Sequence, residues 1–238
     1  MFIEFNPNDP FPLYSAMDYN YEDAKSHSRQ ADLWLKLKTH RTEKRIQTRL
    51  LVPKTRWDAE QNEPNESLPM HPEQEWSGLA VQTLMTPYWE IRSLLNILPL
   101  EDNQHIVDLG CAYARMGHVI GTHYPSLFFT GYEISSERVT EAQRILKRFD
   151  YPRIEVVQQD LSDPEFAPVP ADYYFIYDFG TSQSVQKSLN DLKKIATSRR
   201  IQVIARGGIS RNLIFQRHSW LCDVHPPKNY SHFSIFRS

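Results

Sequence analysis

The chain has 238 residues and a formal net charge of −2, with 40% hydrophobic and 24% charged residues. This length and balance allow one sizeable hydrophobic core but not two. The only cysteines are Cys111 and Cys222, which excludes a disulfide framework and favours a reducing compartment. No apolar run approaches the roughly 18 residues of a membrane span and no leader-like segment opens the chain, so we expect a cytoplasmic protein without membrane contact.

Charge is segregated in the first third of the chain. Residues 25–56 carry ten Lys and Arg against two acids, whereas residues 58–75 carry six acids, three prolines and no Lys or Arg. The basic segment predicts a helix, although its leucines at 33–37 also alternate as in a strand. Its charged face is either solvated or in contact with an acidic partner or a nucleic acid. The acidic, proline-containing segment indicates a linker, and about the first 20 residues indicate an extended arm.

Hydrophobic periodicity predicts alternating helices and strands along the rest of the chain. The first helical stretch lies within 75–98, and Pro87 suits the first turn of its second helix. Ser136 is the expected N-cap of a later helix. This alternation is typical of an α/β fold with a doubly wound, mostly parallel sheet, and it separates an N-terminal extension, 1–75, from a domain, 76–238. Strands are expected at 104–109, 127–133, 154–159, 173–177 and 201–205, and helices at 116–123, 136–149, 184–196 and 212–220.

The stretch from Ile106 to Gly117 is the most informative motif in the chain. An apolar run ends in Asp108, and Gly110 and Ala112 follow in a small-residue turn before a predicted helix. Such a turn lets the backbone approach a ligand, and the N-terminal N–H groups of the helix favour a nucleotide-like cofactor. The glycine pattern of a dinucleotide fingerprint is degenerate here, because alanines stand at its second and third positions.

Carboxylates stand at or next to the ends of four predicted strands. They are Asp108, Glu133, Asp160 and Asp178. The carboxyl ends of parallel strands lie at one edge of a sheet, and ligands bind outside that edge. A single acid at such a position often serves only as a helix N-cap or a turn residue. Four of them around a small-residue turn favour a ligand-binding site.

Over about residues 80–238 these motifs resemble the class I, seven-stranded family of S-adenosylmethionine-dependent methyltransferases, which has a Rossmann-like fold. The resemblance implies S-adenosyl-L-methionine as cofactor and a sheet that ends in an antiparallel pair, here 222–224 and 232–237. The chain departs from the family pattern at Ala112 and Ala114. The implied cofactor residues are Asp108, Gly110, Cys111 and Ala112 in the first motif, Glu133 and Ile134 at the ribose, Asp160 and Leu161 at the adenine, and Asp178 and Phe179 near the methionine moiety and the incoming nucleophile.

A second, weaker resemblance concerns the methyl acceptor. Thr86-Pro87-Tyr88 and the stretch from Gly131 to Ile134 look like the small non-SET lysine methyltransferases. This resemblance implies methyl transfer to a protein lysine, with Asp178, Phe179 and Tyr113 as the catalytic candidates. In those families aromatic surfaces admit the lysine chain, and the candidates here are Tyr88, Trp89, Tyr113, Tyr177 and Phe179.

Methyl transfer from a sulfonium chiefly requires an enzyme to position an uncharged nucleophile and to exclude water, so we expect no fixed catalytic triad. The fourth predicted strand is followed by Asp178-Phe179-Gly180 rather than by an Asn/Asp-Pro-Pro-aromatic motif, and no Pro-Cys nucleophile motif occurs. These features argue against enzymes that act on exocyclic or amide nitrogens or on cytosine carbon-5. The alternatives are methylation of a small molecule or an RNA, and a non-catalytic binding module with the same fold.

Four metal-capable side chains lie near the C-terminus, namely His218, Cys222, His225 and His232. Their spacing is not that of a recognised zinc finger, and ordinary surface or core histidines are more common. We therefore expect no metal site.

Overall fold

The structure is a computed structural model that describes residue 86 and residues 88–230 and 233–238. The predicted N-terminal extension, with its basic segment and its acidic linker, lies outside the described residues. The side chains of Tyr88 and Trp89, two of the aromatic candidates, lie outside them as well. None of the helices in the described part is long and apolar enough to cross a membrane.

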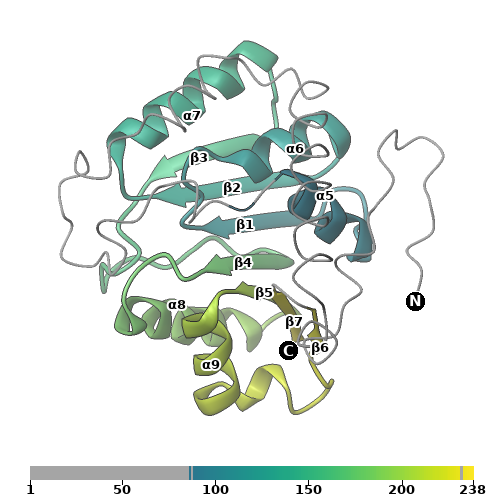
Figure 1. Cartoon of the computed structure of the whole chain (residues 1–238), viewed down its shortest axis with the longest axis vertical. Coiled ribbons are helices and arrows are strands. Elements are labelled where there is room, and N and C mark those ends of the chain that lie inside the picture. The colour runs from purple at the N-terminus through teal and green to yellow at the C-terminus, as the bar shows by residue number, and fades with distance from the viewer. Residues whose placement is uncertain (1–85, 87, 231–232) are drawn as a thin grey trace, which may run out of the picture.

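Seven strands in the described residues form one sheet with the order β3-β2-β1-β4-β5-β7-β6 (Figure 1). The first five strands in this order run parallel, whereas β7 runs antiparallel to both β5 and β6. This confirms the mostly parallel sheet with an antiparallel end, which is the Rossmann-like fold of the class I methyltransferases. The strands are β1 His105–Leu109, β2 Phe128–Glu133, β3 Ile154–Gln158, β4 Tyr173–Tyr177, β5 Gln202–Arg206, β6 Lys228–Asn229 and β7 Phe233–Arg237.

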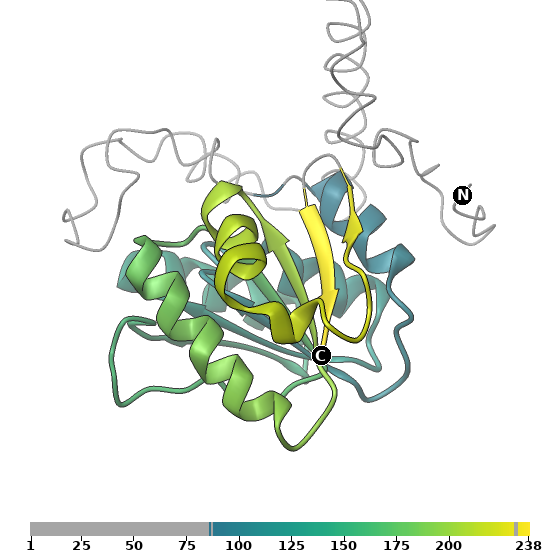
Figure 2. The same ribbon diagram turned by 90° about the horizontal axis from the view of Figure 1, so that it is seen from below.

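Helices cover both faces of this sheet, as Figures 1 and 2 show. Apolar side chains of α5, α6 and α7 belong to one buried cluster, and those of α8 and α9 belong to the other. The sheet is therefore doubly wound, as the sequence predicts. The helices are α5 Tyr88–Ile97, α6 Arg115–His123, α7 Ser136–Phe149, α8 Ser182–Ala196 and α9 Gly208–Arg217.

The central strand β4 shows why its sequence is apolar throughout. Tyr173 and Phe175 belong to the cluster under α5, α6 and α7, whereas Tyr174 and Ile176 belong to the cluster under α8 and α9. Successive side chains of a strand point to opposite faces, so a strand that is covered on both sides buries all of them. The two tyrosine hydroxyls donate to backbone carbonyl oxygens at 2.9 and 2.8 Å, which satisfies their polar atoms.

The cap of α7 and the bounds of α9 differ from the expected ones, and α8 begins two residues earlier than expected. Helix α7 is capped by Ser135 rather than Ser136, because the Ser135 hydroxyl accepts the N–H of Arg138 at 3.3 Å. Two adjacent serines carry the same capping signal, and only the backbone geometry separates them. Helix α9 begins at Gly208 instead of residue 212 and ends at Arg217. A short 3-10 helix, Ser219–Leu221, takes the place of its expected last turn.

The expected edge strand at 222–224 is wrong. The N–H groups of Cys222 and Asp223 both donate to the carbonyl oxygen of Ser219, at 2.6 and 2.8 Å, and are therefore not available to a neighbouring strand. The edge strand is β6, which follows two prolines and pairs with β7.

Candidate functional site

The turn after β1 is built on the end of the neighbouring strand β2. The N–H groups of Gly110 and Cys111 both donate to the carbonyl oxygen of Tyr132, at 3.0 and 2.9 Å. Oε2 of Glu133 accepts the N–H of Ala112 at 2.9 Å. The predicted ribose carboxylate thus holds the backbone of the predicted cofactor turn.

Three residues of this turn have left-handed backbone. The φ angles are +85° at Gly110, +48° at Ala112 and +53° at Ala114. Only glycine fits the first position, because a Cβ there would lie 2.4 Å from Cβ of Phe179. At the other two, an L-residue costs roughly 1–2 kcal/mol. The hydrogen bond of Ala112 to the Glu133 carboxylate and the 2.8 Å bond from Ala114 N–H to the Cys111 carbonyl oxygen offset this cost.

Glu133 lies at the end of β2 and is 4% exposed. Its Oε1 accepts the N–H of Ser135 at 3.0 Å and lies 3.6 Å from Nη1 of Arg138, which is also buried. A carboxylate offers about four acceptor positions, so these contacts leave room for a ligand hydroxyl. The next residue, Ile134, is half-buried. The ribose-binding role of both residues stays a prediction.

A pocket opens between the carboxyl ends of β1, β4 and β5 on one side and α5 and α6 on the other. Arg206 lines this pocket, although it is not among the site residues predicted from the sequence. It stands directly after a predicted strand, as the predicted carboxylates do, and this position is the signal that could have identified it. The predicted cofactor residues that line it are Asp108, Gly110, Cys111 and Ala112. Further lining residues are Thr86, Arg115 and Tyr177, and the apolar Ile91, Leu94, Met116, Phe175 and Ile204.

The Asp108 carboxyl group in this pocket is a weaker acid than an ordinary aspartate. Burial and, to a lesser extent, the charge of Glu133 raise its pKa to about 7. Both effects disfavour the charged form of a carboxyl group. Near neutral pH this carboxyl group is therefore protonated far more often than an ordinary aspartate.

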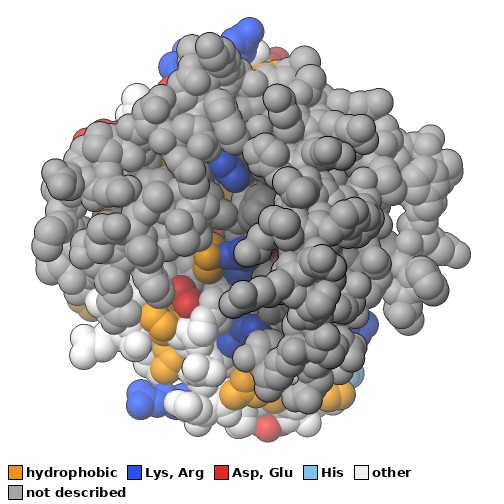
Figure 3. Space-filling view, in the orientation of Figure 1, with side chains coloured by type: hydrophobic (Ala, Val, Ile, Leu, Met, Phe, Trp, Pro, Cys, Tyr) orange, Lys and Arg blue, Asp and Glu red, His pale blue; other side chains and the backbone are white. Residues whose placement is uncertain are grey.

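The pocket wall also holds an ion pair between a half-buried arginine and a buried glutamate. Arg206, at the end of β5, donates to both carboxylate oxygens of Glu90 in α5, from Nε at 2.8 Å and from Nη2 at 3.1 Å. The guanidinium also lies 4.1 Å from the ring centre of Tyr177. Burial, the largest single effect, lowers the pKa of Arg206, but the charge and hydrogen bonds of Glu90 together with the contribution of Tyr177 outweigh it and raise the pKa above its usual value. Basic side chains are also visible near the centre of the face in Figure 3.

Asp178, at the end of β4, is bound to the start of α9. Its Oδ2 accepts the N–H of Ile209 at 3.0 Å, and its Oδ1 accepts the N–H of Ser210 at 2.8 Å. Gly207 has a φ of +98°, and a Cβ there would lie 2.1 Å from Oδ2. The carboxylate therefore satisfies the free N–H groups of the helix and explains why α9 begins earlier than expected.

The other two catalytic candidates, Phe179 and Tyr113, pack against the turn after β1. Phe179 is half-buried and lies directly against Gly110, and Tyr113 is 6% exposed and in contact with Ala112. Together with Asp178 they lie outside the lining of the described pocket. Their catalytic roles stay predictions.

The predicted adenine residues lie after β3. Oδ1 of Asp160 accepts the N–H and the hydroxyl of Ser162, at 2.8 and 2.6 Å. Leu161 is 6% exposed and belongs to the same buried cluster as Val185 and Leu189 of α8. Asp160 therefore begins a tight turn whose next residue is anchored in the core.

The described residues contain no group of three or more His, Cys, Asp or Glu side chains that could hold a metal ion. His218 is buried, and its ring nitrogens lie 2.6 Å from the Gln186 side-chain nitrogen and 3.1 Å from the Trp220 indole nitrogen. His232 lies outside the described residues.

No family model matches the chain, and no curated protein matches it. Similar solved structures include the pyocyanin biosynthetic protein PhzM, with a TM-score of 0.49 and 12% identity over 67% of this chain and 55% of that one. A SAM dependent methyltransferase from Aquifex aeolicus has a TM-score of 0.47 and 11% identity over 62% of this chain and 88% of that one.

A StiE O-MT structure has a TM-score of 0.43 and 17% identity over 50% of this chain and 42% of that one. The chain thus spans about half the length of PhzM and less than half of the StiE structure. Because all three TM-scores lie below 0.5, the fold assignment rests on the strand order of the sheet itself.

Proposed function

We propose that the chain is an S-adenosylmethionine-dependent methyltransferase. The observation that carries this proposal is the turn from Asp108 to Ala112, which the Glu133 carboxylate holds and which lines a pocket at the carboxyl ends of parallel strands. Ligands of doubly wound sheets bind at this edge. The side chains present suit the cofactor, because carboxylates accept hydrogen bonds from ribose hydroxyls and from an ammonium group, and an arginine such as Arg115 can pair with the carboxylate of the methionine moiety.

The bound cofactor supplies an electrophilic methyl group on a sulfonium. In this proposal Glu133 accepts hydrogen bonds from the ribose hydroxyls, and Asp160 with Leu161 contacts the adenine. Arg115 is the first residue of α6 and lines the pocket, so it and the N–H groups of that helix end bind the carboxylate of the methionine moiety. Asp108 stabilises the positive charge of the cofactor when it is ionised.

Asp178 and Phe179 act in this proposal as positioning residues. Asp178 holds the start of α9, and Phe179 supports the turn at Gly110. Both contacts fix the backbone at the carboxyl ends of β1 and β4, where the methyl group is transferred. Holding donor and acceptor in line and excluding water supplies most of the rate of such a displacement.

For the acceptor we propose a protein lysine. The sequence resemblance supports this class, and the apolar lining of the pocket suits the aliphatic part of a lysine side chain. The attacking amine has to be neutral. The apolar lining of the pocket favours that form, because removal from water lowers the pKa of an amine.

Titration calorimetry with S-adenosylhomocysteine tests the cofactor. We expect saturable binding by the wild type, and a loss of affinity of about tenfold or more in Glu133→Ala. Glu133→Gln keeps an acceptor for the Ala112 N–H and is expected to lose less. Glu141→Ala, which removes a surface pair with Arg144 on α7, is the matched control and should bind as the wild type does. Absence of binding at about 1 mM ligand, or unchanged affinity in Glu133→Ala, contradicts the proposal.

Incubation with labelled S-adenosylmethionine and fractionated cell extract tests the acceptor. We expect the label in protein, on lysine after hydrolysis. Label in small molecules or RNA contradicts the lysine proposal but not the enzyme class. Cofactor binding without transfer to any fraction indicates a non-catalytic binding module.

A further inference from the structure

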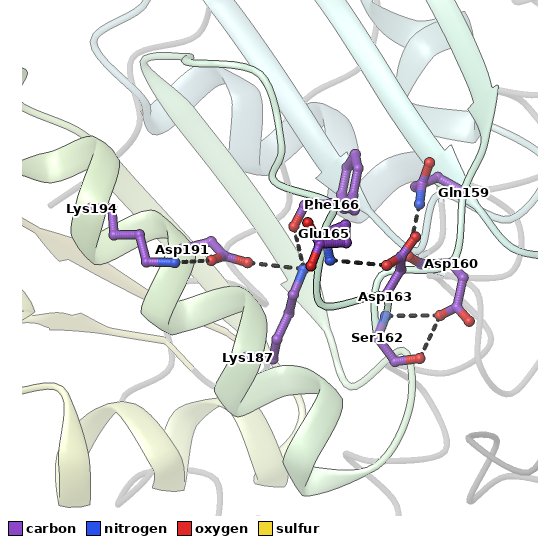
Figure 4. A network of polar contacts seen from close by, with 9 residues as sticks. All are labelled: Gln159, Asp160, Ser162, Asp163, Glu165, Phe166, Lys187, Asp191 and Lys194. Carbon is purple, nitrogen blue, oxygen red and sulfur yellow. Dashed lines mark hydrogen bonds and ion pairs between the residues drawn. The ribbon is translucent and has the colours of Figure 1, made fainter.

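The connection from β3 to β4 contains no helix or strand in the described structure, yet it carries both predicted adenine residues. Two consecutive turns order its first half (Figure 4). The N–H of Asp163 donates to the Asp160 carbonyl oxygen at 3.3 Å, and the N–H of Phe166 donates to the Asp163 carbonyl oxygen at 3.1 Å. Two hydrogen-bonded turns therefore connect Phe166 to Asp160.

Lys187 of α8 fixes the end of these turns. Its Nζ donates to the carbonyl oxygen of Phe166 at 2.5 Å and lies 5.2 Å from the centre of the same ring. The ammonium group also pairs with Oδ2 of Asp191 at 3.0 Å, and the two side chains are 22% and 7% exposed. Lys194 pairs with the other oxygen of Asp191, but its side chain is 78% exposed (Figure 4). Asp191 thus orients one half-buried lysine toward the loop and one surface lysine toward solvent.

The ring of Phe166 also packs against β2, the strand that ends in Glu133. It meets the ring of Tyr132 edge to face, with 5.0 Å between the ring centres. The Tyr132 hydroxyl accepts the N–H of Val169 at 3.2 Å, and its carbonyl oxygen accepts two N–H groups of the cofactor turn. Lys187 and Phe166 therefore tie α8 to both the adenine side and the ribose side of the site.

We propose that Lys187 is a positioning residue that sets the adenine selectivity of the cofactor site. This inference rests on the proposed function, because it assigns Asp160 to the exocyclic amine of adenine. Lys187 reaches the loop from α8 and is not one of the residues that line the pocket. Its effect on binding acts through Phe166 and the two turns, so it concerns the adenine more than the rest of the cofactor.

Calorimetry with two ligands tests this role. The ligands are S-adenosylhomocysteine and S-inosylhomocysteine, in which a carbonyl oxygen replaces the exocyclic amine. Lys187→Met keeps the apolar stem and removes the hydrogen bond and the charge. We expect it to bind S-adenosylhomocysteine about tenfold more weakly than the wild type. Its preference over the inosine analogue should fall as well. Lys187→Arg, which can donate to the same carbonyl oxygen, should restore part of both.

Lys194→Met is the matched control, because it removes a lysine that contacts the same aspartate but not the loop. We expect its affinity and its preference to equal those of the wild type. Should Lys187→Met not fold, Phe166→Leu keeps the backbone carbonyl and removes the ring contacts, and it should reduce the preference in the same direction.

Three results would overturn the inference. If Lys187→Met binds both ligands as tightly as the wild type does, Lys187 has no role in cofactor binding. An equal loss for both ligands shows a general structural effect without adenine selectivity. A wild type that binds neither ligand overturns the proposed function and this inference with it, whereas the first two results leave the proposed function intact.

Discussion

The ends of β1 and β2 differ from the ends of β4 and β5 in how their charges are paired. At the first pair of strands, Asp108 lines the pocket and Glu133 holds the turn, and the charge of Glu133 contributes to the raised pKa of Asp108. At the second pair, Asp178 is bound by the start of α9 and Arg206 is bound by Glu90. A charged residue at a strand end thus marks a position of chemical interest. Its partner decides between binding a ligand and holding the fold.

The largest expected effect concerns the ion pair of the second region. Glu90→Gln leaves the half-buried Arg206 charge with an uncharged partner, and we expect the free energy of unfolding to fall by about 3 kcal/mol. Urea denaturation followed by circular dichroism measures it. Replacing both Glu90 and Arg206 by Met should cost less than the single change, because no unpaired charge remains.

Glu141→Gln, in an exposed pair on α7, is the control and should cost about 1 kcal/mol or less. A loss of similar size in Glu90→Gln and Glu141→Gln contradicts the view that the pair on the pocket wall stabilises the fold.

The next effect concerns Asp108 and its dependence on pH. Its pKa is about 7 in the folded chain against 3.8 for an ordinary aspartate, so the unfolded chain loses this proton first as pH rises. Between about pH 4 and pH 7 the wild type therefore loses stability relative to Asp108→Asn, by at most about 1.4 kcal/mol per pH unit. Below pH 4 both states carry the proton, and the difference between the two proteins no longer changes with pH. Urea denaturation of both proteins at several pH values measures this.

The same carboxyl group predicts a pH dependence of cofactor binding. A positively charged cofactor favours the ionised form, so the affinity for S-adenosylmethionine should rise as pH increases toward and through about 7. Asp108→Asn should abolish this rise. A flat pH profile in the wild type separates Asp108 from the cofactor and weakens the contrast between the two regions.

The smallest effect concerns Asp178, the carboxylate whose two oxygens each accept one backbone N–H. Asp178→Asn satisfies only one of them, and we expect the free energy of unfolding to fall by about 2 kcal/mol. The affinity of the folded protein for S-adenosylhomocysteine should stay within about threefold of the wild type. An affinity loss at unchanged stability assigns Asp178 to the cofactor, as its sequence motif implies.

Local patterns predict what neighbouring residues determine. The apolar runs before Asp108, Glu133 and Asp178 identify the strands, and strand ends in a parallel sheet share one edge, so the site edge follows from the sequence. Contacts between residues that lie far apart in the sequence cannot be predicted in this way. Glu90 and Arg206 are separated by 116 positions, and neither residue's type indicates the other. The true start of α9, four residues before the expected one, is unpredictable for the same reason. Its N–H groups donate to Asp178 at the end of β4 rather than to a nearby cap.

The two left-handed alanines of the cofactor turn bear on how such sites are found in genomes. An alanine codon becomes a glycine codon by a single base change, so this chain stands two such changes from a glycine-rich turn. The turn keeps its shape because Glu133, on the adjacent strand, accepts the N–H of Ala112. A search that scores glycines passes over chains of this kind. A search that scores the spacing between Asp108 and the acid that ends the next strand retains them.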